Sequence, residues 1–217
     1  MSGPRPIRLV AVADTHLQHA EVEIPDGDIL IIAGDITRRG TLPQLAQALE
    51  FFRRQAHRDK ILIAGNHEFC LQNTPEQARP LLDGFHYLLD SGITLHGLRF
   101  WGTPWQPWFY NWAFNLQRGP DLAAKWALIP DDTDVLISHG PPRGYGDDTG
   151  RERVGCDDLL TRVRELRPLV HLYGHIHEDR GHWRLGESLL VNVTVDEGAA
   201  PATILDIDVE QRRARLA

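Results

Sequence analysis

The segment HLYGHIHE, residues 171–178, places His171, His175 and His177 within or directly after an apolar run. A neutral imidazole binds transition metals and also carries protons near neutral pH, so closely spaced histidines are candidates for both kinds of chemistry. One interpretation is a metal site at the end of a buried strand. The alternative is a set of surface histidines without a ligand, and this segment alone is compatible with both.

Ligand-type side chains follow four other apolar runs in the same way. They are Asp14 and His16 in DTH, Asp35 in GD, Asn66 and His67 in GNHE, and His139 in SHG. Each motif alone is weak, because Asp-x-His and Gly-Asn are also common in caps and turns. Their repetition behind five successive apolar runs is hard to explain by chance. Glycine directly before Asp35, Asn66 and His175 would allow the sharp backbone exit that such loops need.

The apolar runs alternate with helical patterns, which is typical of an α/β fold. Strands are expected at 7–13, 28–33, 60–65, 134–140, 169–174 and 189–195. One amphipathic helix is expected at 41–56, with Thr41 as its N-cap, and a second at 156–168, beginning near Asp157 or Asp158. Near-continuous Val, Ile and Leu indicates strands covered on both faces. A hairpin turning at His96–Gly97 and an alternating, half-exposed strand at 201–210 indicate a mixed or antiparallel later part. Ligands bind at the carboxyl ends of such strands, where we expect the polar residues to meet.

The donor types predict a metal centre. Carboxylate, amide oxygen and imidazole together suit Mn, Fe, Zn or Ni, whereas Mg and Ca prefer oxygen alone. Seven such ligands are more than one ion uses. Two ions about 3.5–4 Å apart that share one carboxylate would use them all, and they would form a clamp for displacement at phosphorus. Asp35, the solitary acid between two ligand groups, is the expected bridge through its two oxygens.

Composition excludes several classes of function. The chain has 217 residues, of which 42% are hydrophobic and 24% charged, so we expect one soluble domain over 1–217. The net charge of −7 repels extended polyanions, so no stable nucleic-acid complex is expected, whereas metal cations are compatible. No apolar run is long enough for a membrane span or a signal-peptide core, and we expect a cytoplasmic protein. Cys70 and Cys156 form no disulfide or zinc motif.

The ordered motifs resemble a known superfamily. The series Asp14-x-His16, Gly34-Asp35, Gly65-Asn66-His67-Glu68, His139-Gly140 and Gly174-His175-x-His177 resembles the calcineurin-like metallophosphoesterases over residues 8 to about 195. GTPWQPWFYNWAFN, SHGPPRGYGD and HLYGHIHE further resemble its metallophosphoesterase-domain-containing branch, which is related to class III cyclic nucleotide phosphodiesterases. The resemblance implies an α/β fold with a four-layer α/β/β/α sandwich, two mixed β-sheets, a dinuclear site and phosphoester hydrolysis. It implies that Asp14, His16, Asp35 and His177 hold one metal, that Asp35, Asn66, His139 and His175 hold the other, and that His67 is the catalytic histidine outside the ligand set.

Two positions depart from the usual pattern of related enzymes. The common GDxxDR motif is GDITRR here, so Arg38 stands where an Asp often supports the catalytic histidine, while Arg39 matches the next Arg and is a candidate substrate contact. Without that acid, slow turnover or another partner for His67, such as Glu68, is expected. Protein phosphatases of the superfamily carry Arg where this chain has Ala64, which disfavours a phosphoprotein substrate.

We therefore expect a dinuclear metal-dependent phosphodiesterase for small nucleotide or cyclic nucleotide diesters, with a metal-bridging hydroxide as nucleophile and Mn as the favoured metal in assays. Arg143 is a second candidate substrate contact, with a solvated loop arginine as the favoured alternative. The aromatic-rich segment 101–114 is expected to be mainly a packing plug, with some rings available for base stacking. The six other histidines are expected at the surface or beside the ligands, with His171 as the candidate exception; they are His19, His57, His86, His96, His171 and His182. Alternative functions are a slow-turnover nucleotide-binding regulatory module and, less favoured, a nuclease or protein phosphatase.

Overall fold

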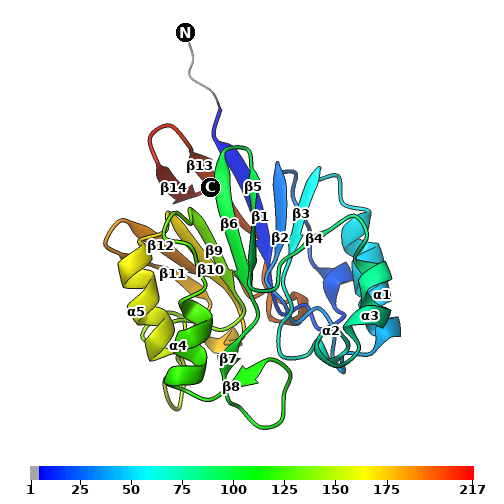
Figure 1. The fold of residues 1–217 in the computed structure, drawn as a ribbon. Helices are drawn as coiled ribbons and strands as arrows, with labels where there is room; N and C mark the ends of the chain where they lie inside the picture. Colours follow the sequence, from blue (N-terminus) through cyan, green and yellow to red (C-terminus); the bar gives the residue numbers. More distant parts are fainter. Residues whose placement is uncertain (1–4) are drawn as a thin grey trace.

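Two six-stranded β-sheets face each other, and helices cover the outer face of each sheet (Figure 1). This arrangement confirms the four-layer α/β/β/α sandwich. The structure is a computed structural model that describes residues 5–217, so the first four residues of the expected domain over 1–217 lie outside it. Within the described part of the chain, no helix has both the length and the apolar character needed to cross a bilayer.

The first sheet has the strand order β14-β13-β1-β2-β3-β4. Its members are β1 (Ile7–Val12), β2 (Ile29–Ile32), β3 (Asp59–Leu62), β4 (His86–Tyr87), β13 (Thr203–Asp208) and β14 (Arg213–Leu216). Strands β1 to β4 run parallel, and β13 pairs antiparallel with β1, with Leu9 opposite both Ile29 and Leu205. The carboxyl ends of β1, β2 and β3 therefore lie at one edge of this sheet.

The second sheet has the order β11-β12-β10-β9-β6-β5. Its members are β5 (Ser91–Leu95), β6 (Leu98–Thr103), β9 (Val135–Ser138), β10 (Val170–Tyr173), β11 (Gly181–Leu185) and β12 (Ser188–Asn192). Strands β6, β9, β10 and β12 are parallel, and the two outer strands are antiparallel to them. The predicted hairpin is confirmed, because His96 and Gly97 turn between β5 and β6 with φ of 51° and 80°. A separate short sheet joins β7 (Gln106–Pro107) to β8 (Asn115–Leu116).

The helices form two groups. Beside the first sheet lie α1 (Leu42–Arg53), α2 (Phe69–Asn73) and α3 (Pro75–Ala78), and beside the second lie α4 (Pro120–Trp126) and α5 (Asp157–Leu166). Short 3₁₀ turns are η1 (His19–Glu21), η2 (Arg79–Leu82), η3 (His177–Asp179) and η4 (Asp196–Gly198). Thr41 caps α1 as predicted, since its hydroxyl accepts the Gln44 N–H at 3.4 Å. At α5 the cap is the Cys156 sulfur, and Asp157 and Asp158 occupy the first turn.

Three buried clusters explain the continuous apolar strands. In β2, Ile29 and Ile31 face the core between the sheets, whereas Leu30 and Ile32 face the helices of the first group. Each residue of such a strand is therefore buried on one side or the other, which removes the alternation seen in half-exposed strands. The strand predicted at 201–210 is more covered than expected, because even the outward carboxylate of Asp206 is buried under Arg8.

Candidate metal centre

The loops that follow β1, β2, β3, β9 and β10 meet at one end of the sandwich, which is the lower end in Figure 1. They bring the predicted ligands together in three overlapping groups whose ligand atoms lie within 4.8 Å of one another. The groups are Asp14, His16 and His177; His16, Asp35 and His67; and Asp35, His139 and His175. Asn66 adjoins the third group, because its Oδ1 lies 3.0 Å from His139 Nε2. The donor types and their spacing fit a site for divalent metal ions.

The Asp35 carboxylate occupies the centre of the cluster. Its Oδ2 lies 3.3 Å from His139 Nε2, 3.9 Å from His16 Nε2 and 4.0 Å from His67 Nε2. Its Oδ1 instead accepts the backbone N–H of His67 at 2.8 Å. Oδ2 is thus the oxygen nearest the imidazole rings, and Oδ1 also anchors the loop that carries His67, while the bridging role of Asp35 stays a prediction.

Backbone and carboxylate oxygens orient the histidine rings. The Nδ1 of His16 donates to the Thr37 carbonyl at 3.1 Å, and the Nδ1 of His139 donates to the Ala33 carbonyl at 3.0 Å. His177 Nδ1 lies 3.0 Å from Asp196 Oδ1 in the same manner. Because these oxygens only accept, the proton is on Nδ1 and each Nε2 is turned toward the cluster. Such hydrogen bonds fix ring orientation and tautomer in metal sites.

Four of the predicted ligands have left-handed backbone conformations. The φ angles are 59° for Asp14, 41° for His16, 55° for Asp35 and 73° for His175. Residues other than glycine rarely adopt this region, and each instance costs of order 1–3 kcal/mol unless the surroundings enforce it. Strain of this kind concentrates at functional sites, where side chains must be aimed at one point.

The glycines before the ligands serve two purposes. Gly34, with φ of 94°, makes the predicted sharp exit from β2. Gly65 and Gly174 are not left-handed, so that expectation is wrong for them. They allow close approach instead: a Cβ on Gly65 would lie 2.3 Å from Asp35 Oδ1, and one on Gly174 would lie 2.4 Å from Asp14 Oδ2.

Glu68 connects the loop after β3 to the loop after β2. It is fully buried, and its Oε2 accepts the N–H groups of Asp35 at 2.8 Å and Gly65 at 2.7 Å. Its Oε1 accepts from Thr37, through the N–H at 3.0 Å and the hydroxyl at 2.9 Å. Three of these four bonds hold backbone N–H groups at or near the metal-type ligands, so Glu68 stabilises the site without facing it.

Burial and neighbouring charges shift the pKa values of several groups in the cluster. Burial raises the pKa of the Asp14 carboxyl. Burial also acts on Asp35, but the neighbouring imidazoles, His139 above all, outweigh it and lower the pKa of this carboxyl. Burial lowers the pKa of His139, yet the Asp35 carboxylate outweighs burial and raises it to about 9. Burial lowers the pKa of His175 to about 3, so this ring is neutral at pH 7, which is the form that binds a metal.

The calcineurin-like phosphoesterase family model matches residues 7–179 of the chain. The chain belongs to this family. Metallophosphoesterase domain-containing protein 1 of Homo sapiens is 39% identical over 222 residues, which cover 89% of this chain and 68% of that protein. Two solved structures share the fold. Phosphopantetheinyl hydrolase from Mycobacterium tuberculosis has a TM-score of 0.62 and 18% identity, with 100% of this chain and 97% of that chain covered. An archaeal phosphodiesterase has a TM-score of 0.51 and 16% identity, with 97% of this chain and 99% of that chain covered. By family, this chain is a metal-binding phosphoester hydrolase.

In this phosphoesterase the Nδ1 of His67 donates to the backbone carbonyl of Arg38 at 2.6 Å. The Arg38 guanidinium turns away from the ring, donating to the His16 carbonyl at 2.8 Å and pairing with Glu197 at 2.6 Å. Glu68 uses its carboxylate on backbone groups, so the expectation that it partners the His67 ring is wrong. Trp112 packs on that ring instead, with centroids 4.2 Å apart and planes tilted by 30°.

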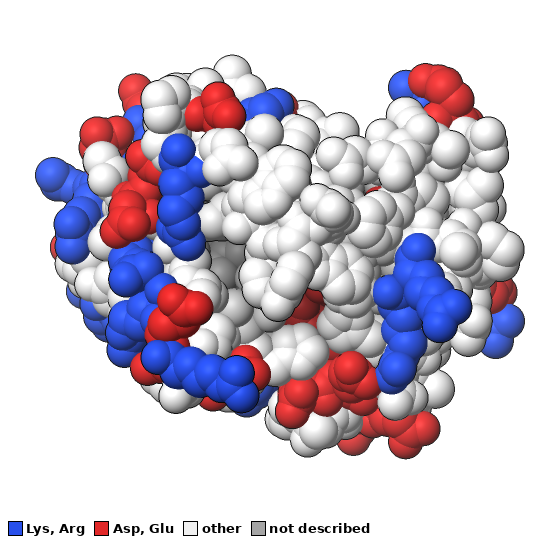
Figure 2. Space-filling view, turned by 90° about the horizontal axis from the view of Figure 1, so that it is seen from below, with Lys and Arg blue, Asp and Glu red and all other residues white. Residues whose placement is uncertain are grey.

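Two cavities meet at the cluster, and both are lined by Phe109 and His175. One, of about 530 Å³, includes His67, Trp112 and Arg39; the other, of about 630 Å³, includes Trp108, Arg118 and Arg143. The two predicted substrate contacts, Arg39 and Arg143, therefore line different cavities. From this end of the molecule, uncharged side chains occupy the middle of the surface and basic side chains lie on two sides of it (Figure 2).

The aromatic-rich segment divides between packing and exposure. Trp108, Phe109 and Tyr110 are 53%, 49% and 74% exposed. Trp105 is half-buried, and its indole N–H donates to Asp90 Oδ2 at 2.8 Å. The packing role is confirmed for Trp105, whereas base stacking on the exposed rings stays a prediction.

Not all the other histidines lie at the surface. His19 and His57 are buried, which contradicts their expected position, and His171 is completely buried. His19 packs on the Phe51 ring of α1 at 4.8 Å, because η1 folds against that helix. Sequence motifs also give no sign of Asp196 as a partner of His177, since it lies outside them.

Proposed function

We propose that this phosphoesterase is a dinuclear metal-dependent phosphodiesterase that hydrolyses small nucleotide diesters, cyclic nucleotides among them. The observation that carries this proposal is the pair of cavities that meet at the Asp35 cluster, with Phe109 and His175 in the wall of both. A phosphate bound at the cluster has room for a substituent on each side, as a diester needs, whereas a monoester would leave one cavity unfilled.

In this proposal one ion is held by Asp14, His16, Asp35 and His177, and the other by Asp35, Asn66, His139 and His175. The overlapping groups of ligand atoms, and the Nε2 atoms of His16 and His139 that are turned toward the cluster, support this division. The mixed oxygen and nitrogen donors suit Mn, Fe, Zn or Ni, and we favour Mn for assays. Divalent ions at such a site supply Lewis-acid stabilisation of the phosphate charge and activation of water.

The chain's own residues supply proton transfer and orientation. His67 keeps one proton on Nδ1 through its bond to the Arg38 carbonyl, so its Nε2, 4.0 Å from Asp35 Oδ2, is the atom that faces the cluster. In the imidazolium form it donates the Nε2 proton to the leaving oxygen as a general acid. Trp112 limits rotation of the ring by packing on it.

The larger cavity supports a planar substituent on the substrate. Trp108 and Phe109 offer exposed aromatic faces, and stacking on such faces binds any nucleobase with little sequence preference. Arg143 is half-buried in the same wall, where its Nη1 donates to the Arg153 carbonyl at 2.6 Å, so it is more ordered than a solvated loop arginine. We assign Arg143 to this cavity and Arg39 to the smaller one as substrate contacts.

The test uses diesters with different leaving groups. With Mn added, the chain should hydrolyse bis(p-nitrophenyl) phosphate and cyclic nucleotides faster than p-nitrophenyl phosphate. His67→Ala should keep its metal content and lose ~100- to 10,000-fold in kcat for alkyl leaving groups, but less for p-nitrophenyl, which needs no proton. His182→Ala, at an exposed histidine on β11, is the matched control. Faster monoester hydrolysis, or an equal loss for both leaving groups, contradicts the proposal.

A second candidate is a nucleotide-binding regulatory module with slow turnover. It is supported by the carbonyl partner of His67, which stabilises an imidazolium less than a carboxylate does. Measuring nucleotide binding and turnover in the same sample separates the phosphodiesterase from the regulatory module. Tight nucleotide binding without Mn-dependent hydrolysis favours the regulatory module.

A further inference from the structure

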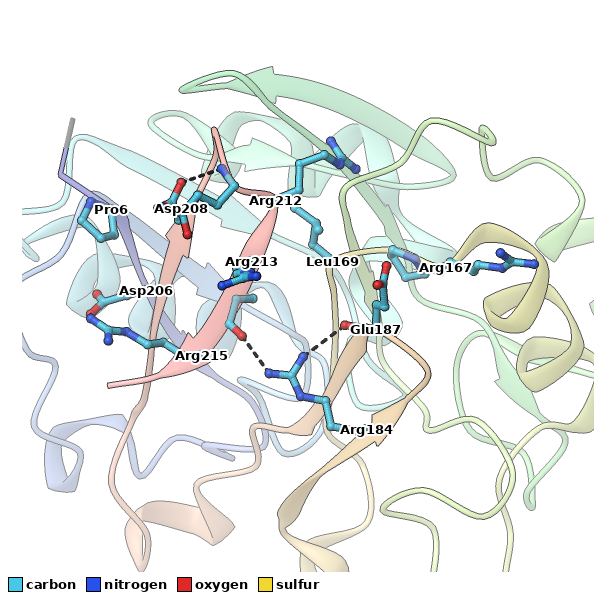
Figure 3. A pocket seen from close by; sticks show the side chains of 13 residues that line it. Pro6, Arg167, Leu169, Arg184, Glu187, Asp206, Asp208, Arg212, Arg213 and Arg215 are labelled. Carbon is cyan, nitrogen blue, oxygen red and sulfur yellow. Dashed lines mark hydrogen bonds and ion pairs between the residues drawn. The ribbon is translucent and has the colours of Figure 1, made fainter. Parts of the chain in front are cut away.

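Another cleft, of about 840 Å³, lies at the opposite end of the sandwich from the metal cluster. Figure 3 shows the residues that line it. The segment before β1, the connection from α5 to β10, and the turns of the β11–β12 and β13–β14 hairpins surround it. Its charged residues are Arg167, Arg184, Arg212, Arg213 and Arg215 against Glu187, Asp206 and Asp208. Five arginines and three carboxylates leave a local charge of +2, in a chain whose net charge is −7.

Two of these carboxylates are already engaged. Asp206 lies 2.9 Å from the guanidinium of Arg8 and 3.7 Å from that of Arg215. Asp208 stands opposite Arg213 in the hairpin, but its Oδ1 accepts the Gln211 N–H at 2.8 Å.

The arginines differ in how they are paired. Arg212 pairs with the buried Asp134 at 2.9 Å. Within residues 5–217, Arg167, Arg184 and Arg213 have no carboxylate oxygen within 4.0 Å. Three residues that line the cleft therefore carry guanidinium groups without a carboxylate partner, although Arg167 extends away from Arg184 and Arg213 in Figure 3.

Arg184 is held in place by neutral acceptors. Its guanidinium donates to the Glu187 carbonyl at 3.1 Å and to the Ala214 carbonyl at 2.9 Å, so it spans the edge strands of the two sheets (Figure 3). Carbonyl partners fix the group without neutralising it. A guanidinium oriented in advance loses less conformational entropy when it binds an anion.

We propose that this cleft binds a small anion with two linked phosphate groups, such as a diphosphate ester. Guanidinium groups recognise phosphate oxygens through paired, charge-assisted hydrogen bonds, and three unpaired arginines match a ligand with more than one phosphate. The volume lies within the range of small-molecule sites, ~300–1,000 Å³. The net charge of −7 disfavours an extended polyanion here as elsewhere. This site is separate from the metal centre, and its test uses the proposed reaction only to count binding at that centre.

The test is calorimetric titration of the metal-loaded full chain with methylenediphosphonate, whose P–C–P link no phosphoesterase cleaves. Inhibition of bis(p-nitrophenyl) phosphate hydrolysis reports binding at the metal centre, so the calorimetric site count minus that site reports the cleft. Arg167→Gln with Arg213→Gln should weaken cleft binding at least ~10-fold per arginine and leave hydrolysis unchanged. Arg79→Gln, at an exposed arginine in η2, is the control.

Binding at the cleft that weakens as salt increases, and that falls at least ~100-fold in the double variant but not in Arg79→Gln, supports the proposal. A single site accounted for by inhibition, or a double variant with unchanged affinity, overturns it.

Discussion

Replacing Glu68 by Gln should lower the free energy of unfolding by ~1–3 kcal/mol, the cost of one buried donor left without an acceptor. The best placement of the amide puts its oxygen where Oε2 accepts from Asp35 and Gly65. Its NH₂ then faces Thr37, whose hydroxyl can turn to accept but whose N–H cannot. Glu68→Ala leaves three N–H groups without a partner and should lower the free energy of unfolding by ~3–9 kcal/mol. This loss approaches the whole free energy of unfolding of a domain, ~5–15 kcal/mol.

Urea unfolding of the chelator-treated protein measures this difference, with Glu76→Gln at an exposed position as the matched control. The same Gln variant should also release metal more readily on dialysis, because Glu68 holds the backbone of Asp35. A Gln variant as stable as the control would refute the assignment of Glu68 as the buried acceptor that joins the loops. A loss of metal without a loss of stability would place it among the ligands instead.

Three further changes test other parts of the site and core. Asp35→Asn should reduce retained metal more than Asn66→Ala, because a neutral amide cannot balance two cations, and metal analysis after dialysis checks this. Trp112→Ala should lower kcat ~2- to 13-fold, the equivalent of an aromatic pair worth 0.5–1.5 kcal/mol, with KM nearly unchanged and most activity kept in Trp112→Phe; a change in KM alone would make Trp112 a substrate contact. Burial lowers the pKa of His171 to about 3, so between pH 6.5 and 3 this histidine is protonated in the unfolded chain and neutral in the folded chain. This group therefore costs ~1.4 kcal/mol of stability per pH unit as pH falls from 6.5 toward 3, and His171→Leu should flatten that slope in urea titrations, whereas an unchanged slope would assign the loss to other groups.

The sheets and the ligand cluster could be predicted because they follow from local patterns. Strands such as β2 lie between two cores, so their composition alone identifies them. Parallel strands then bring their carboxyl ends together, which is why Asp35 and His139 meet although they lie far apart in the chain.

Other features depend on contacts that no motif encodes. The carbonyl of Arg38 bonds the His67 ring while the Arg38 side chain turns to Glu197, and residue identity at position 38 does not reveal this. The burial of His19 depends on how η1 folds onto α1. The purpose of Gly65 is set by the position of a carboxylate from another loop, which only the folded chain determines.

The pairing of β1 with β13 has a consequence for synthesis of the protein. Leu9 emerges from the ribosome long before its antiparallel neighbour Leu205 is translated. Until then β1 has an open hydrogen-bonding edge, and an exposed apolar edge is where nascent chains associate wrongly. The loop that carries Asp14 and His16 directly follows that strand, so metal uptake before β13 has been translated would occur on an incompletely folded chain.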